Sequence, residues 1–187
     1  MKAKVTRQLH CIYSLIDKDA IIYMGKDKFE NETLIKFALP HDIWFHVDTM
    51  SSAHVYLRMK TPITSYEELP AKCVEECAQL TKENSIEGCK KKGVPIIYTW
   101  ASNLLKEDDM QTGAVSFKNH SLVVNMHVEK KNDVIKKIQK TKVEAYPNLE
   151  KEYNEYMKQY KKDQEIKKRL ETKQKLEEEK KRKEESD

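Results

Sequence analysis

Two neighbouring segments decide the fold: Asp42-Ile-Trp-Phe-His-Val-Asp48 and Ser52-Ala-His-Val-Tyr-Leu-Arg58. Both alternate with a period of two and both are rich in aromatic and β-branched residues, which is typical of half-buried strands. A turn centred on Met50 places Ile43 opposite Leu57 and makes one face of the hairpin wholly apolar. A slip of one residue would mix the two faces, so the pattern itself indicates the register.

The other face of this hairpin carries aromatic, imidazole, acidic and basic groups, and we call it the polar plate. In one interpretation it is the second side of a sheet, covered by a helix and held by hydrogen bonds and a cross-strand ion pair. In the other it is an open platform that stacks on bases and contacts phosphate or ribose. Its cross-strand pairs are Asp42 with Arg58, Trp44 with Tyr56, His46 with His54, and Asp48 with Ser52.

His46 and His54 allow two further chemistries. With an acidic third ligand they could hold a metal ion, although no ligand spacing supports this, and no metal site is predicted. As two imidazoles they could serve as general acid and base on a phosphodiester, and they are the candidate catalytic residues. The sequence has no Walker loop, Gly-rich dinucleotide motif, nucleophile elbow or zinc-protease motif, so no cofactor is expected.

On the N-terminal side, Leu9–Ile16 and Ala20–Met24 are short apolar runs that predict a second hairpin. Gly25 ends its second strand. Asp27, followed three residues later by Glu30, predicts the capped start of a helix. Lys26 lies in this strand-to-helix turn, where a helix N-terminus suits an anion.

On the C-terminal side, periodicity predicts further strands and helices without strict alternation. The fold class is therefore α+β, with a mostly antiparallel mixed sheet flanked by helices and followed by a long charged helix. The expected elements are a helix from Tyr66 or Pro70 to Lys82, strands at Val94–Trp100 and Ser121–Val128, a short strand at Ala114–Phe117, and a basic helix at Lys131–Ala145.

Composition changes near Pro147. Residues 1–146 hold most of the apolar side chains and form the predicted nucleic-acid-binding domain, whereas residues 147–187 are dominated by Lys, Glu and Arg. Glu four residues before a basic residue recurs there and supports a solvated helix. A seam of Leu149, Tyr153, Tyr156 and Tyr160 leaves a coiled coil, with a helical partner or a second copy, as the alternative.

Charge and cysteine content narrow the protein class. The net charge of +4 permits binding to phosphates without requiring it. The four cysteines do not resemble a disulfide scaffold; Cys73 and Cys77 share a helical face and are expected to be buried. No apolar run is long enough for a membrane span. We expect a cytoplasmic protein, with the nucleus as the alternative. Lys90, Lys91 and Lys92 form a basic loop that could contact phosphates.

Several separated motifs resemble the NFACT-R domain, in its small stand-alone branch. They cover about residues 20–145 in order. These motifs are Tyr23-Met-Gly-Lys-Asp27, Asn31-Glu32, residues 42–48, Ser51-Ser-Ala-His-Val-Tyr-Leu-Arg58, Asn84-Ser-Ile-Glu-Gly-Cys-Lys90, Tyr98-Thr-Trp100, Asn103-Leu104 and Met110…Gly113…Val115…Phe117.

The resemblance implies binding to RNA, either tRNA or rRNA, and a link to the large ribosomal subunit in translation quality control. It adds Asn31, Ser52, Trp100 and Asn103 to the RNA-contacting candidates Lys26, Trp44, His46, His54, Tyr56, Arg58 and Lys90–Lys92. Three functions remain open: an RNA-binding module; an enzyme that cleaves near the tRNA end of stalled peptidyl-tRNA; and a DNA-binding sensor or helical adaptor.

Overall fold

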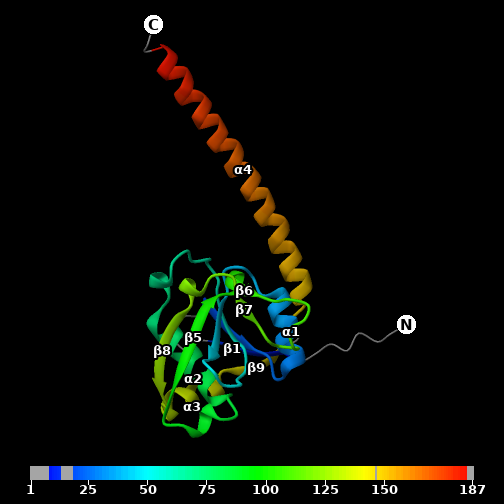
Figure 1. Ribbon diagram of the computed structural model, residues 1–187, viewed down its shortest axis with the longest axis vertical. Coiled ribbons are helices and arrows are strands. Elements are labelled where there is room, and N and C mark those ends of the chain that lie inside the picture. Colours follow the sequence, from blue (N-terminus) through cyan, green and yellow to red (C-terminus); the bar gives the residue numbers. More distant parts are fainter. Residues whose placement is uncertain (1–8, 14–18, 146, 185–187) are drawn as a thin grey trace, which may run out of the picture. The chain divides into compact units, whose positions relative to one another are not determined.

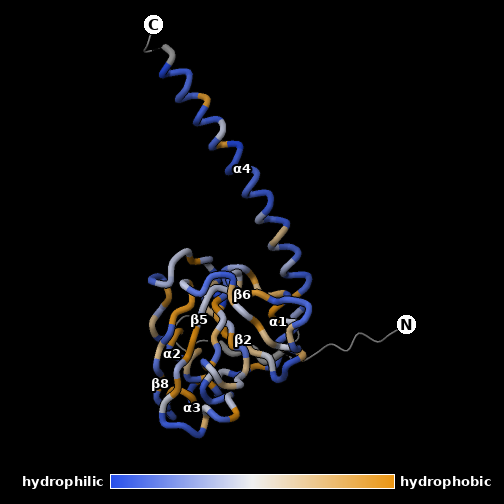
Figure 2. Tube along the Cα trace, in the orientation of Figure 1, coloured by the Kyte–Doolittle hydropathy of each residue, from blue (hydrophilic) through white to orange (hydrophobic). Residues whose placement is uncertain are grey.

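The computed structural model describes residues 9–13, 19–145 and 147–184 of the chain (Figure 1). Two compact units can be distinguished from their internal packing, Met1–Pro147 and Asn148–Asp187. Figure 2 shows hydrophobic residues concentrated in the strands and in helix α2 (Ala71–Glu83) of the first unit. The second unit is coloured as hydrophilic over most of its length.

Within the described residues of the first unit, seven strands form one sheet, in the order β8-β5-β3-β4-β2-β1-β9. The neighbouring strands are antiparallel, and the α+β class is confirmed. The strands are β1 (Leu9–Tyr13), β2 (Ala20–Met24), β3 (Ile43–Val47), β4 (Val55–Met59), β5 (Gly93–Trp100), β8 (Val124–Glu129) and β9 (Lys142–Ala145).

The central hairpin has the predicted register, because Ile43 pairs with Leu57 and Phe45 with Val55. Its apolar face forms the core together with α2. Cys73 and Cys77 of that helix are free thiols that lie fully buried against the sheet, as their spacing predicts. This packing occupies one side of the sheet, so the polar plate must face the other side.

The other side of the sheet is covered by helix α1 (Lys28–Phe37) and a small ribbon of β6 (Leu104–Leu105) and β7 (Ser116–Phe117). Phe117 meets Trp44 edge-on, with ring centroids 5.7 Å apart. Gly113 adopts a φ of 82°, a conformation that favours glycine, and its N–H donates to Glu32 of α1 at 2.7 Å. The ribbon and α1 therefore form a third layer.

The expected helix at Lys131–Ala145 is wrong in its second part. Helix α3 covers only Asn132–Lys140 and buries Ile135 and Ile138. Thr141 ends it, and β9 pairs with β1, so that Ala145 lies opposite Leu9 instead of on a helix face. Strand β6 has no counterpart among the expected elements. The short 3-10 helices are η1 (Tyr66–Glu68), η2 (Gly88–Lys90), η3 (Ala101–Asn103) and η4 (His120–Leu122).

The second unit is the helix α4 (Leu149–Glu184), as the charged sequence predicts. Tyr156 and Tyr160 of the expected seam stack with ring centroids 6.1 Å apart. Lys173 and Glu177 form one of the solvent-exposed i,i+4 ion pairs along it, and such a pair adds a few tenths of a kcal/mol. Among the described helices none has the length and apolar character needed to cross a bilayer.

Candidate nucleic-acid interface

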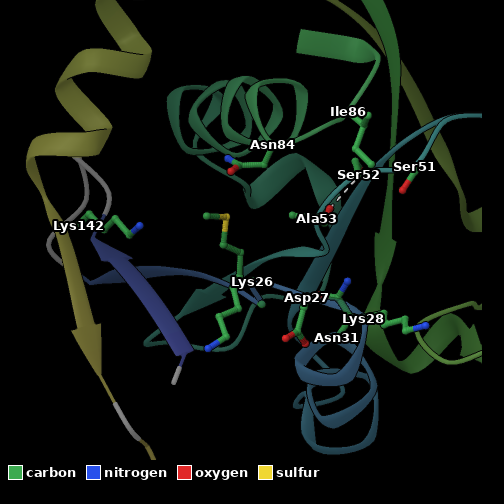
Figure 3. A pocket seen from close by; sticks show the side chains of 12 residues that line it. Lys26, Asp27, Lys28, Asn31, Ser51, Ser52, Ala53, Asn84, Ile86 and Lys142 are labelled. Carbon is green, nitrogen blue, oxygen red and sulfur yellow. Dashed lines mark hydrogen bonds between the residues drawn. The ribbon is translucent and has the colours of Figure 1, made fainter. Parts of the chain in front are cut away.

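A pocket of about 450 Å³ lies where four segments of the first unit meet (Figure 3). The first segment is the turn into α1, residues 24–28, with Asn31 one turn further on. The loop between β3 and β4 contributes residues 51–53, and the end of α2 contributes Asn84 and Ile86. Lys142 of β9 closes the ring.

The first wall is a tightly capped helix start. The carboxylate of Asp27 accepts hydrogen bonds from the N–H groups of Phe29 and Glu30, both at 2.9 Å. Glu30 in turn accepts from the N–H of Lys26 at 2.8 Å. A Cβ on Gly25 would come within 2.6 Å of Asn31 Oδ1, so glycine allows the asparagine to pack against the strand end. The capping hydrogen bonds and the close packing at Gly25 therefore fix the conformation of the turn and the position of Asn31.

The opposite wall is equally well fixed. Ser85 Oγ donates to the carbonyl of Ser51 at 2.7 Å, and the N–H of Ala53 donates to the carbonyl of Asn84 at 3.0 Å. Ser52 Oγ donates to the carbonyl of Ala53 at 3.1 Å and accepts from the N–H of a β3 residue. These bonds join two segments that are far apart in the sequence, so the wall is preorganised.

The pocket combines positive charge with amide and hydroxyl groups. Among its described lining residues, Lys26, Lys28 and Lys142 are basic and Asp27 is acidic, which leaves an excess of positive charge. Lys26 Nζ lies 3.6 Å from the buried Glu30 carboxylate, so part of its charge is compensated. Such a surface suits a single phosphate accompanied by groups that can accept or donate hydrogen bonds.

The polar plate, in contrast, is closed. Trp44 is 2% exposed, His54 3% and Tyr56 0%, which makes base stacking on these rings impossible in this structure. The expectation of an open platform is therefore wrong, and the covered alternative holds. The covering layer consists of α1 and the β6–β7 ribbon, which the strand pattern alone could not reveal.

Asp42 and Arg58 form the ion pair at one end of the plate. Arg58 donates through Nε and Nη2 to the two Asp42 oxygens, at 2.8 and 2.7 Å. The same carboxylate accepts from Tyr23 Oη at 2.5 Å and from the N–H of Leu39 at 2.7 Å. Burial, followed by the charge of Asp42, raises the pKa of Tyr23. Arg58 is thus a structural residue, since its guanidinium is already engaged.

His46 and His54 pack edge to face, with ring centroids 5.3 Å apart. Burial, followed by the neighbouring His46 and by Lys106, lowers the pKa of His54 to about 3. Burial also lowers the pKa of His46, whose Nδ1 lies 2.7 Å from the carbonyl of Val47. Burial thus lowers the pKa of both imidazoles, so the protonated form of either ring is disfavoured here. No three potential ligands gather for a metal ion among the described residues.

Three polar atoms of the plate are buried without a hydrogen-bond partner in the described part of the chain: Trp44 Nε1, His54 Nδ1 and Tyr56 Oη. A buried polar atom in this state costs about 1–3 kcal/mol relative to one that is paired. The centre of the plate is therefore held by packing, whereas its Asp42–Arg58 end is held by hydrogen bonds. Tyr56 stacks on Tyr23 with ring centroids 5.0 Å apart, which keeps its ring in place.

Tyr56→Phe is expected to leave the free energy of unfolding unchanged or to raise it by up to about 1 kcal/mol, because it removes an unpartnered hydroxyl. Tyr23→Phe is the matched control: its hydroxyl donates to Asp42, and its loss should cost about 1–3 kcal/mol. Urea denaturation of both variants measures the difference. Equal losses would show that Tyr56 Oη has a partner.

The basic loop Lys90–Lys92 is exposed and is fixed from below by Lys82. The Lys82 ammonium is fully buried and donates to the carbonyls of Gly88 and Lys91, at 2.6 and 2.5 Å. Lys92 lies 3.9 Å from Glu129, a weak surface pair. Lys90 follows Ile86 by four residues. The Cα atoms of these two residues therefore lie within about 15 Å of each other. The loop can thus extend the basic surface of the pocket.

The candidates Trp100 and Asn103 lie elsewhere and have structural roles. Trp100 stacks on Tyr66 with ring centroids 4.9 Å apart and packs against the core. Asn103 is buried and donates to Thr99 Oγ1 at 3.0 Å and to the carbonyl of Asn119 at 2.9 Å. These bonds anchor the covering ribbon. Their predicted role as RNA contacts stays a prediction, made at positions outside the pocket.

Of the residues predicted for binding, the structure brings Lys26, Asn31 and Ser52 together in the pocket. It adds Lys28, Asn84, Ile86 and Lys142, which are not among the predicted RNA contacts. Asn84 and Ile86 lie in a motif quoted for the family resemblance, which could have pointed to them. The place of Lys142 at the pocket could not be predicted, because the sequence pattern predicts a helix at that position.

The match to a family model places the α+β unit in a known class of RNA-binding domains. The chain is a member of the family described as the NFACT protein RNA binding domain, which it matches over residues 11–119.

The chain is also similar in sequence to two named proteins. Coiled-coil domain-containing protein 25 of Danio rerio is 51% identical over 129 residues, which cover 68% of this chain and 62% of that protein. Protein JLP2 of Saccharomyces cerevisiae is 38% identical over 140 residues, 73% of this chain and 67% of that protein. The chain thus spans less than two thirds of the length of the Danio rerio relative.

One solved structure has a similar fold. It is the C-terminal part of the fibronectin/fibrinogen-binding protein from Streptococcus suis, with a TM-score of 0.57. The match covers 68% of this chain and 48% of that one at 22% sequence identity. At this identity the likeness concerns the fold alone.

Proposed function

We propose that this protein binds RNA at the pocket between α1, the β3–β4 loop and the end of α2. The observation that carries the proposal is the meeting of Lys26, Lys28 and Lys142 with buried and exposed amides at one preorganised site. Basic side chains neutralise phosphates, whereas amides and hydroxyls select among nucleotide groups. The basic loop at Lys90–Lys92 supplies further phosphate contacts.

The RNA that we propose is tRNA or rRNA, with the large ribosomal subunit as its setting and translation quality control in the cytoplasm as its process. This follows the family resemblance. The closed plate, where burial lowers the pKa of both imidazoles, favours binding over cleavage. We further propose that α4 contacts a helical partner or a second copy through Tyr153, Tyr156 and Tyr160, independently of RNA.

The double variant Lys26→Gln, Lys28→Gln is expected to weaken RNA binding about tenfold near 0.15 M salt and to lower the salt slope by about 1–2. Fluorescence anisotropy with tRNA, rRNA fragments and duplex DNA at two salt concentrations measures this, and each endpoint is run on a gel.

The control is Lys136→Gln, Lys137→Gln, which removes the same charge from the exposed side of α3. It should leave affinity within about twofold, since general charge acts weakly at a distance in salt. If both double variants lose affinity equally, the pocket is not the binding site. Tighter binding to duplex DNA would favour the DNA sensor, and shortened tRNA on the gel would favour the enzyme.

A further inference from the structure

We infer that the pocket accepts one unstacked nucleotide, so that the protein recognises single-stranded RNA in preference to a duplex. This inference rests on the proposed function and specifies its ligand class. Three observations support it: the size of the pocket, the amide oxygen of Asn31, which is unpaired among the described residues, and the exposed apolar side chains beside the pocket.

The size of the pocket suits one nucleotide. Its volume of about 450 Å³ falls within the range of small-molecule sites, roughly 300–1,000 Å³. Bases in an A-form helix are stacked and paired, and their edges lie in grooves below the phosphates. A duplex could therefore touch only the rim, whereas an unstacked base can enter.

Asn31 gives the pocket a recognition group beyond its charges. The residue is 8% exposed, lines the pocket, and its Oδ1 has no hydrogen-bond partner among the described residues. An amide carries both a donor and an acceptor group, and Asn31 Oδ1 is the buried one, beside Gly25. Nucleobase edges offer both, and asparagine is a common partner of adenine.

Asn84 supplies a second amide from the opposite wall. Its Nδ2 donates to the carbonyl of Leu80 at 2.8 Å, which caps α2 and fixes the orientation of the side chain. Figure 3 shows Asn31 and Asn84 on facing segments of the pocket. Two fixed amides on facing walls can bracket a planar base, which a pure phosphate site does not require.

Two apolar side chains near the pocket are exposed. Ile86, on its rim, is 72% exposed, and Phe29, next to Lys28 in the first turn of α1, is 48% exposed. The Lys28 ammonium lies 5.3 Å from the Phe29 ring centroid. Aromatic side chains such as Phe29 stack unpaired bases while lysines follow the backbone, and the aliphatic Ile86 can cover a base through apolar contact.

The experiment compares a single-stranded RNA with a duplex of the same sequence, using the full chain at one salt concentration. We expect the single strand to bind at least about tenfold more tightly. Ile86→Ser should reduce this preference to about twofold or less and leave the salt slope unchanged, because no charge is removed. Leu122→Ser, an exposed apolar residue on η4, is the matched control and should retain the full preference.

Competition identifies what the pocket recognises. Nucleoside 5′-monophosphates should displace the labelled single strand at concentrations about tenfold below those of inorganic phosphate. Asn31→Asp and Asn84→Ala should remove the advantage of the mononucleotides over phosphate. Circular dichroism serves as the control that both variants fold. A deoxynucleotide arm tests whether ribose is required.

The inference and the proposed function can fail separately. If phosphate competes as well as the mononucleotides, or if the duplex binds equally tightly, the pocket recognises only phosphate, and the inference is overturned while RNA binding stands. If the wild-type chain binds neither RNA nor mononucleotides, both are wrong. If mononucleotides bind but RNA does not, the pocket is a nucleotide site and the proposal that the protein binds RNA is wrong.

Discussion

Asp42→Ala is expected to lower the free energy of unfolding by about 3–5 kcal/mol, the largest loss that we predict for any single substitution. The carboxylate is fully buried and accepts from Arg58, Tyr23 and the backbone at Leu39. Its removal leaves a guanidinium that is 16% exposed and a buried hydroxyl without an acceptor. Urea denaturation monitored by circular dichroism measures the loss.

A surface pair of similar length provides the control. Lys60 Nζ lies 3.0 Å from Asp19 Oδ1, but these side chains are 76% and 63% exposed. Asp19→Ala should therefore cost less than about 1 kcal/mol. The double variant Asp42→Ala, Arg58→Met should recover part of the loss, because no uncompensated charge remains. If Asp42→Ala and Asp19→Ala lowered the free energy of unfolding equally, the importance of the buried Asp42 network would be contradicted.

Acidification from pH 7 to pH 5 is expected to remove about 2 kcal/mol of stability through His54 alone. Burial and the neighbouring His46 and Lys106 lower the pKa of His54 to about 3 in the folded chain. In the unfolded chain the imidazole takes up a proton below about pH 6.5. The unfolded state then binds more protons, so stability falls as the pH falls from about 6.5 towards 3.

The substitution His54→Phe tests this, because it keeps an aromatic ring and removes the titration. Its free energy of unfolding should depend less steeply on pH between 7 and 5 than that of the wild type. His120→Phe removes one histidine from an exposed position and controls for composition. A His54→Phe profile parallel to the wild type would show that the buried imidazole is not neutral.

The sequence predicts the central hairpin well because its constraint is local. Its apolar residues alternate with polar ones on both strands, so only one register keeps Phe45 and Val55 together in the core. The Asp27 cap is local in the same sense, since its hydrogen bonds reach only two and three residues along the chain. Such features need no knowledge of tertiary packing.

What the sequence does not predict depends on packing between distant segments. The alternation at the plate shows that Trp44 and Tyr56 share a face, but not that α1 and the β6–β7 ribbon cover it. The pocket is assembled from four separate segments, so Asn84 and Lys142 carry no local signal of their position. Residues 142–145 continue a basic helical pattern and become a strand only because β1 is available for pairing.

The buried Lys82 ammonium makes this lysine a chemical reporter of the fold. An amine-reactive acylating reagent can modify exposed lysines at once, whereas Lys82 is sealed beneath η2 and bound to two carbonyls. Its labelling must wait until the end of α2 or the 88–91 loop opens, so the rate measures the free energy of that local opening. Mass spectrometry of partly labelled protein can thus follow the stability of one wall of the pocket at a single residue.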